Sequence, residues 1–115
     1  MKTIRFYDEV YLVTYYVTIG GSAKDFKNKL KRHNVKFGKI EPTDYAYFVG
    51  KESKRSMFGF IYCQSYDQIL LAHECLHAVS WVFDKVGLPM TKKCDEAMTY
   101  YQQFLLTKIK EKFNK

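Results

Sequence analysis

A run of twenty-one residues without glycine or proline, from Tyr66 to Val86, most constrains how this chain can fold. Its apolar side chains spread around nearly the whole helical circumference, which predicts a central, buried helix rather than a surface one. Gly87 and Pro89 follow directly and are typical of a helix end. The sequence therefore predicts one long helix over 66–86, on which the rest of the domain must pack.

Length and composition favour one globular domain over residues 1–115. The chain is 47% apolar and 27% charged, within the range of folded domains and large enough for one core. Its three cysteines form no C-x-x-C pair and are too few for a disulfide scaffold, so reduced thiols are expected. No signal-peptide pattern or membrane-length apolar run is present, so we expect a cytoplasmic protein without a membrane partner.

The remaining segments complete an alternation of strands and helices. Ser22 and Asp25 form an S-x-x-D capping signal, Thr91 is a plausible N-cap for the last helix, and residues 35–43 resemble a loop. The order ββαββαα predicts an α+β domain with a mostly antiparallel sheet packed on the long helix. The expected strands cover 2–7, 10–19, 45–49 and 57–63, and the other expected helices cover 23–33 and 91–113.

An H-E-x-x-H motif runs from His73 to His77 inside the long helix. The two histidines lie one turn apart and about 40° around the axis, so both imidazoles can point at one metal ion such as Zn²⁺. Glu74 is offset to the side, where it can reach a metal-bound water as a general base. Ser80 and Asp84 share the histidine stripe and are candidates to support the ligands. The alternative is a pair of core histidines satisfied by hydrogen bonds.

A catalytic zinc usually has a third protein ligand. Glu96 lies eighteen residues after His77, near the start of the last helix, which the turn at 87–89 would fold back beside the motif. Asp95 and Cys94 are alternatives at the same place. His33 is the only other histidine, but its position at the end of a basic helix favours a solvated surface role.

These residues resemble a known family. H-E-x-x-H followed after eighteen residues by glutamate is similar to the gluzincin zinc metallopeptidases, which include thermolysin-like and aminopeptidase N-like enzymes. The sequences HECLHA and DEAMTYY are still more similar to small zincin-like proteins of phages and mobile elements. The resemblance implies His73, His77 and Glu96 as zinc ligands and Glu74 as general base. The Gly-x-x-His of metzincins and the G-x-M-E-N of aminopeptidases are missing, so neither class is expected.

The resemblance also implies a peptide or protein substrate, and the host cytoplasm as location if a phage encodes the chain. Zincins commonly lay an extended substrate along an edge strand beside the motif helix. The strand before that helix is the candidate for such strand addition, with an internal strand as the alternative. Tyr100, one turn after Glu96, is the predicted stabiliser of the oxyanion, with packing as the alternative. The candidate substrate strand consists of Met57, Phe58, Gly59, Phe60 and Ile61.

The basic residues are unevenly distributed. Nineteen Lys and Arg against twelve Asp and Glu leave a net charge of +7, and seven of the basic side chains lie within residues 24–39. A solvated helix face is the ordinary explanation of such a cluster. The alternative function is a non-catalytic zinc-binding module that binds nucleic acid or an acidic protein through residues 24–39.

Overall fold

The computed structural model of the chain describes residues 1–41 and 44–115, and its elements follow the predicted order. Among these residues, no helix is long and apolar enough to cross a membrane. The predicted loop at 35–43 carries no helix or strand over 35–41, and its residues 42–43 lie outside the described residues. The elements are β1 (Lys2–Asp8), β2 (Val13–Ile19), α1 (Ala23–Arg32), β3 (Ala46–Ser53), β4 (Ser56–Cys63), α2 (Gln68–Val86), the 3-10 helix η1 (Lys92–Cys94) and α3 (Asp95–Phe113).

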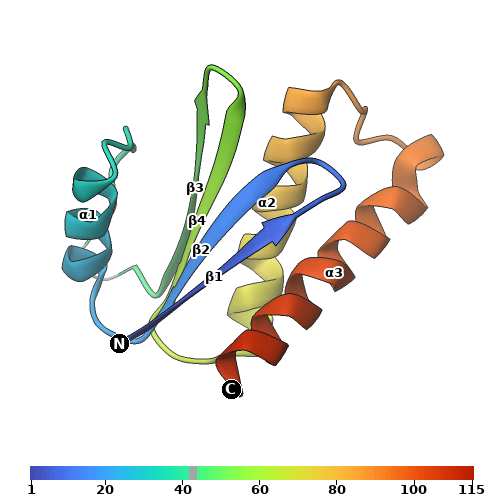
Figure 1. Cartoon of the computed structure of the whole chain (residues 1–115). Helices are drawn as coiled ribbons and strands as arrows, with labels where there is room; N and C mark the ends of the chain where they lie inside the picture. Colours follow the sequence, from blue (N-terminus) through green and yellow to red (C-terminus); the bar gives the residue numbers. More distant parts are fainter. Residues whose placement is uncertain (42–43) are drawn as a thin grey trace.

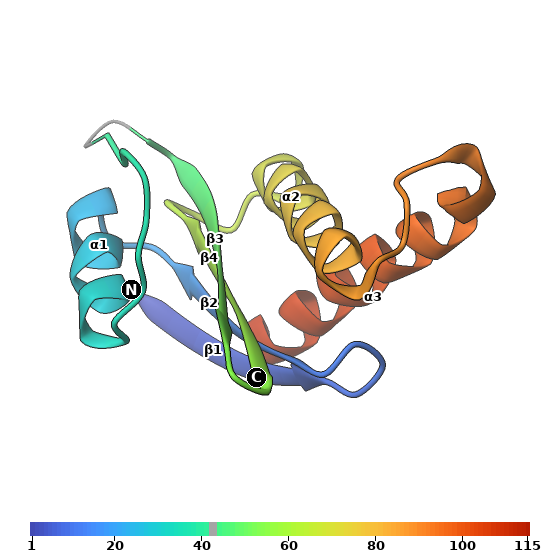
Figure 2. The same ribbon diagram turned by 90° about the horizontal axis from the view of Figure 1, so that it is seen from above.

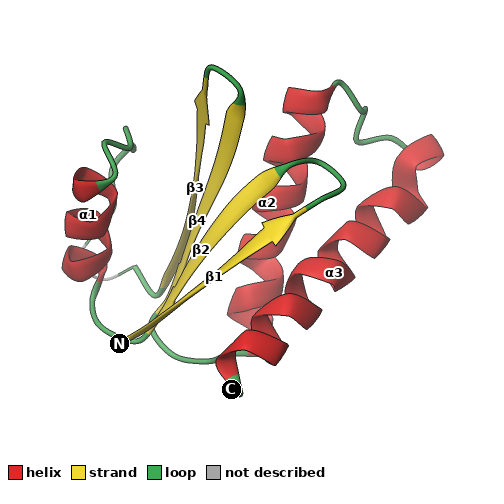
Figure 3. Ribbon diagram, viewed as in Figure 1, coloured by secondary structure: helices red, strands yellow, loops and turns green. Residues whose placement is uncertain are grey.

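The four strands form one mixed sheet in the order β1-β2-β4-β3 (Figures 1 and 3). β1 with β2 and β3 with β4 are antiparallel hairpins, which accounts for the predicted antiparallel character. β2 and β4 are parallel, which the sequence did not indicate. The chain crosses between them through α1 and β3, as parallel neighbours require a long connection. β1 and β3 are therefore the edge strands, and β4 is internal.

The helices lie on both faces of the sheet, with α1 on one side and α2 and α3 on the other (Figure 2). Successive residues of a strand point to opposite faces, so each strand contributes to two separate cores. The larger core lies between the sheet and the pair α2 and α3, and the smaller core lies under α1. The fold is an α+β domain of three layers.

Local signals explain where the helices begin and end. Ser22 and Asp25 form the predicted capping box at the start of α1. At the start of α2, the Asp67 carboxylate accepts hydrogen bonds from two backbone N–H groups of the first turn. The helix ends at Gly87, which has a φ of 78°. The prediction for Thr91 is wrong, because it precedes η1 without a side-chain hydrogen bond, and α3 begins after Cys94.

The prediction of a central, buried helix is also wrong. α2 packs one side on the sheet and contacts α3 with another, but its outer side faces solvent. Two of its apolar side chains are largely exposed there, Ile69 at 82% and Leu76 at 48%. Cys75 has the opposite orientation and is buried in the larger core.

The described cysteines Cys63, Cys75 and Cys94 are all free thiols. Cys63 and Cys75 lie in the larger core, where burial raises the pKa of each thiol to about 12. Both therefore remain protonated at neutral pH and act as small apolar side chains.

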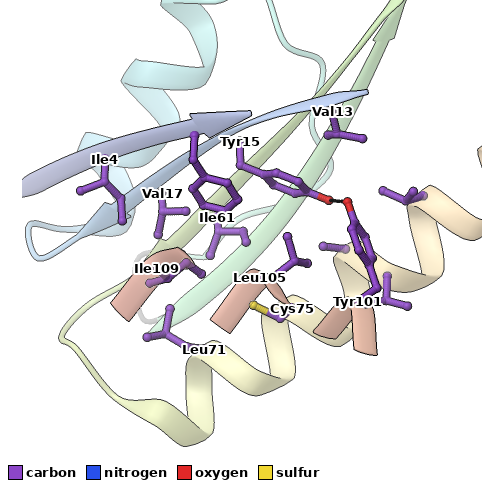
Figure 4. Close-up of a cluster of buried hydrophobic side chains, with 14 of the residues drawn as sticks. Ile4, Val13, Tyr15, Val17, Ile61, Leu71, Cys75, Tyr101, Leu105 and Ile109 are labelled. Atoms are coloured by element: carbon purple, nitrogen blue, oxygen red, sulfur yellow. Dashed lines mark hydrogen bonds between the residues drawn. The ribbon is translucent and has the colours of Figure 1, made fainter. Parts of the chain in front are cut away.

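A buried polar network joins α3 to the first hairpin, and Figure 4 shows its hydrogen bond between Tyr15 and Tyr101. The Tyr101 hydroxyl donates to Asp8 Oδ2 at 2.6 Å and accepts from the Tyr15 hydroxyl at 2.6 Å. The same carboxylate accepts from the backbone N–H groups of Val10 and Tyr11. Burial raises the pKa of both phenols, so they remain neutral donors. Asp8, which is fully buried, thus has a partner for each oxygen.

Tyr101→Phe tests the contribution of this network to stability. The substitution removes the donor to a buried carboxylate, and we expect it to lower the free energy of unfolding by about 1.5–3 kcal/mol. Tyr100→Phe is the matched control, because this neighbouring tyrosine is exposed, and it should change stability by less than about 0.5 kcal/mol. Urea unfolding followed by circular dichroism measures both, and equal effects would contradict the assigned role.

Candidate metal centre

The two motif histidines face each other on the exposed side of α2. Their Nε2 atoms lie 3.1 Å apart, and the ring planes are inclined by 78°. A tetrahedral zinc with Zn–N bonds of about 2.0–2.1 Å separates two nitrogen ligands by about 3.3 Å. The spacing of His73 and His77 therefore fits one zinc ion held through both Nε2 atoms. Without an ion, the same spacing allows one ring to donate a hydrogen bond to the other.

Glu74 lies beside this pair but is nearly buried, with 6% of its surface exposed. Burial raises the pKa of its carboxyl group, His73 acts in the opposite direction, and the carboxylate of Asp44 raises the pKa further. A carboxylate with a raised pKa is a stronger base when it is ionised. Its place next to the histidines, on the wall of the same cavity, is suited to proton transfer.

A cavity of about 860 Å³ joins the histidines to the edge strand β3. Five consecutive residues of β3, from Ala46 to Gly50, line it, so both faces of this strand border the cavity. Among the residues that the structure describes, β3 pairs with β4 alone, so the cavity runs along the unpaired backbone edge of β3, with α2 as its other wall. The remaining lining residues are Lys36, Phe37, Gly38, Asp44, His73, Glu74, His77, Ser80, Trp81 and Asp84.

The predicted substrate strand is wrong. Met57, Phe58, Gly59, Phe60 and Ile61 belong to β4, which pairs with β2 on one side and with β3 on the other. Its backbone groups are used within the sheet, so no peptide can add to it. The strand with a free edge beside the motif helix is β3.

The structure does not bring Glu96 or Tyr100 to the histidines. Neither residue lines the cavity. Both are exposed to solvent, Tyr100 with 65% of its surface. The cause is the burial of Tyr101 against the sheet. At about 100° per residue, Glu96 lies about 140° around α3 from Tyr101, and Tyr100 about 100°. Both therefore point away from the cavity.

Among residues 1–41 and 44–115, no three histidine, cysteine, aspartate or glutamate side chains gather closely enough to hold a metal ion. The alternatives to Glu96 lie elsewhere: Asp95 is exposed, and Cys94 packs against the larger core. Ser80 and Asp84 do lie on the cavity wall with the histidines, as the helical stripe predicts. The pair His73 and His77 is thus the part of the predicted ligand set that the structure brings together.

Sequence reasoning missed the cavity wall opposite α2. β4 is apolar almost throughout, which is typical of a strand buried on both faces, whereas β3 ends in the polar residues KES. That contrast could have identified β3 as the edge strand. Residues 36–38 and Asp44 carried no comparable signal, because their position depends on how the long connection folds around β3.

Trp81 sets the distance between α2 and β3. Its indole ring packs on Gly50, where an added Cβ would lie 2.2 Å from a ring carbon. Phe48 meets the same ring edge-on at 6.0 Å between centroids. The close approach of helix and strand at the cavity therefore depends on a residue without a side chain at position 50.

No protein-family model, curated protein or solved structure shows a significant match to this chain.

Gly50→Ala tests the contact between the Trp81 ring and Gly50. The methyl group would displace the Trp81 ring, and we expect a loss of stability of about 1–3 kcal/mol. Gly38→Ala, in the opposite wall of the same cavity, is the control, because the nearest atom to its Cβ is the Tyr47 hydroxyl at 3.8 Å. Thermal unfolding followed by far-ultraviolet circular dichroism measures both. A Gly50→Ala protein as stable as Gly38→Ala would contradict the described contact.

Proposed function

We propose that this protein is a zinc-dependent hydrolase of the peptidase type, with its active site in the cavity between α2 and β3. The observation that carries the proposal is the facing pair of Nε2 atoms, 3.1 Å apart, next to a nearly buried glutamate. The free edge of β3 along the same cavity supports a peptide as substrate. The H-E-x-x-H sequence supports the same reading independently of the coordinates.

His73 and His77 would hold the ion through their Nε2 atoms. A zinc ion in such a site polarises a carbonyl group and lowers the pKa of water. Two protein ligands leave positions of a tetrahedral ion open to water and substrate. Both rings are exposed at the cavity, so these positions are accessible from the solvent.

Glu74 would act as the general base that removes a proton from the attacking water. The residue precedes Cys75, which anchors this turn of α2 in the core, so the position of its backbone is well defined. Its low exposure keeps competing solvent away from the carboxylate, and the raised pKa makes it a better proton acceptor. The proton can then be passed to the leaving amine by the same carboxyl group.

The substrate would bind as an additional strand on β3. Such strand addition supplies main-chain hydrogen bonds that do not depend on the peptide sequence, while alternate side chains enter pockets on the two sides. Phe48 and Trp81 form an apolar wall on the side of α2, and Phe37 lies on the other side. The volume is within the range of about 300–1,000 Å³ typical of ligand cavities.

Zinc content is the first test. Protein prepared without a histidine tag should contain about one zinc per chain by atomic emission spectroscopy, and His77→Ala should lose it. His33→Ala is the matched control, because this histidine lies at the end of α1, on the α1 face of the sheet, and should leave the zinc content unchanged. Absence of stoichiometric zinc in the unmodified chain would refute the proposed function.

Glu74→Gln separates metal binding from catalysis. The amide keeps the size of the side chain but cannot accept the proton, so we expect unchanged zinc content and a loss of turnover of about 10²–10⁴-fold. Cleavage of labelled casein and of a quenched peptide library measures turnover. Hydrolysis at the original rate by Glu74→Gln would show that this carboxylate is not the base.

A further inference from the structure

A second surface lies on the sheet face that α1 partly covers. Pairing across the four strands places Tyr7, Thr14, Phe58 and Lys51 in one row on this face. The next row consists of Arg5, Tyr16, Phe60 and Val49. Because the intervening residues of each strand point into the larger core, these two rows belong to the α1 side.

Helix α1 covers only part of this face. The Lys29 amine of this helix donates to Thr3 and Thr18, which belong to the row next to that of Arg5 and Tyr16. The His33 ring lies against the rings of Tyr16 and Phe60, with centroids 5.0 and 5.3 Å apart. The helix ends there, and the hairpin ends of the strands extend past it (Figures 1 and 2). Tyr7 remains 48% exposed at the uncovered end.

Aromatic side chains on this surface are held in place by their neighbours. Tyr16 stacks on Phe60 with ring centroids 5.3 Å apart and planes inclined by 11°. The Arg5 guanidinium lies 5.9 Å from the Tyr16 ring. Phe58 is half-buried next to them, and Tyr7 lies two residues from Arg5 on the same side of β1. The result is a patch of aromatic rings with basic groups at its border.

The border of the aromatic patch carries basic side chains, whereas the acidic residues of the same strands lie on the other face of the sheet. Lys51 donates to the carbonyl oxygen of His33 at 2.9 Å, which brings this amine to the end of α1. Burial lowers the pKa of His33, and the charges of Lys29, Arg32 and Lys51 act in the same direction, so all three lie close to it.

The strand carboxylates point the other way. Asp8 is buried under Tyr101, and Glu52 follows Lys51 in β3, so it is on the opposite face. The strand residues on this face of the sheet thus combine positive charge with exposed rings, and the acidic side chain of Glu9 lies in the turn beyond β1.

We propose that this surface, made of Arg5, Tyr7, Tyr16, Phe58, Arg32 and Lys51, binds single-stranded nucleic acid. Bases stack on the exposed parts of Tyr7 and Phe58, while the phosphates contact Arg5, Arg32 and Lys51. A sheet face with exposed rings suits unpaired bases, because a base in a duplex hides both of its faces in the helical stack. An acidic peptide would use the cations but would leave the rings without a partner.

None of the six residues of this surface lines the cavity, so its function is separate from hydrolysis. It also differs from the predicted basic helix, since five of its six residues lie on strands.

Fluorescence anisotropy with a labelled oligothymidine of about fifteen nucleotides tests the proposal on the full chain. We expect binding that weakens steeply between about 50 and 200 mM salt. Tyr7→Ala should weaken binding about tenfold through loss of stacking. Arg5→Ala should reduce the slope of log affinity against log salt by about 1, through loss of one phosphate contact.

Tyr100→Ala and Lys110→Ala are the matched controls, an exposed tyrosine and an exposed lysine on α3, across the sheet from this surface. Both should bind as the unmodified chain does. The proposal is overturned if no binding occurs at low salt, or if the controls lose as much as Tyr7→Ala and Arg5→Ala. Binding of a duplex of the same length as tightly as the single strand would also overturn it. Competition by polyglutamate as effective as that by the unlabelled oligonucleotide would overturn it too and would indicate an acidic protein partner.

Discussion

The hydrogen bond from Tyr101 to the fully buried Asp8 determines how the two sides of the larger core fit together. A buried carboxylate is costly unless each oxygen has a donor, and here the donors come from the β1–β2 turn and from α3. A rotation of α3 would remove the Tyr101 donor. The network therefore specifies which side of α3 faces the sheet, and with it which side faces solvent.

The parallel pairing of β2 and β4 has the next largest effect on the site. It places β4 in the middle of the sheet and leaves β3 at the edge beside α2. The chain after β2 forms α1 on the sheet face opposite α2, and the segment that follows α1 returns along the side of β3 that lies away from α2. As a result, one wall of the cavity comes from α2, and the other comes from a segment that follows α1.

Local structure was largely predictable from the sequence, because periodicity, capping boxes and turn residues act over a few neighbours. The element order, the cap of α1 and the end of α2 all follow from such signals. The stripe of His73, His77, Ser80 and Asp84 was predictable for the same reason, since it depends only on helical geometry.

Long-range relations were less accessible. The pairing of β2 with β4 depends on residues that are far apart in the chain, and no local pattern encodes it. The rotation of α3 depends on which of two adjacent tyrosines, Tyr100 or Tyr101, finds the buried Asp8. The burial of α2 was overestimated because exposed Ile69 and Leu76 are as apolar as core residues.

The contact between Trp81 and Gly50 also gives the cavity an optical property. Trp81 is the single tryptophan of the chain, so the indole emission of the whole protein originates at the wall between α2 and β3. An ion, a peptide or a change in the separation of helix and strand would alter the surroundings of this one fluorophore. Events on the α1 face take place across the sheet from the indole, so the emission of the unlabelled protein reports chiefly on the cavity.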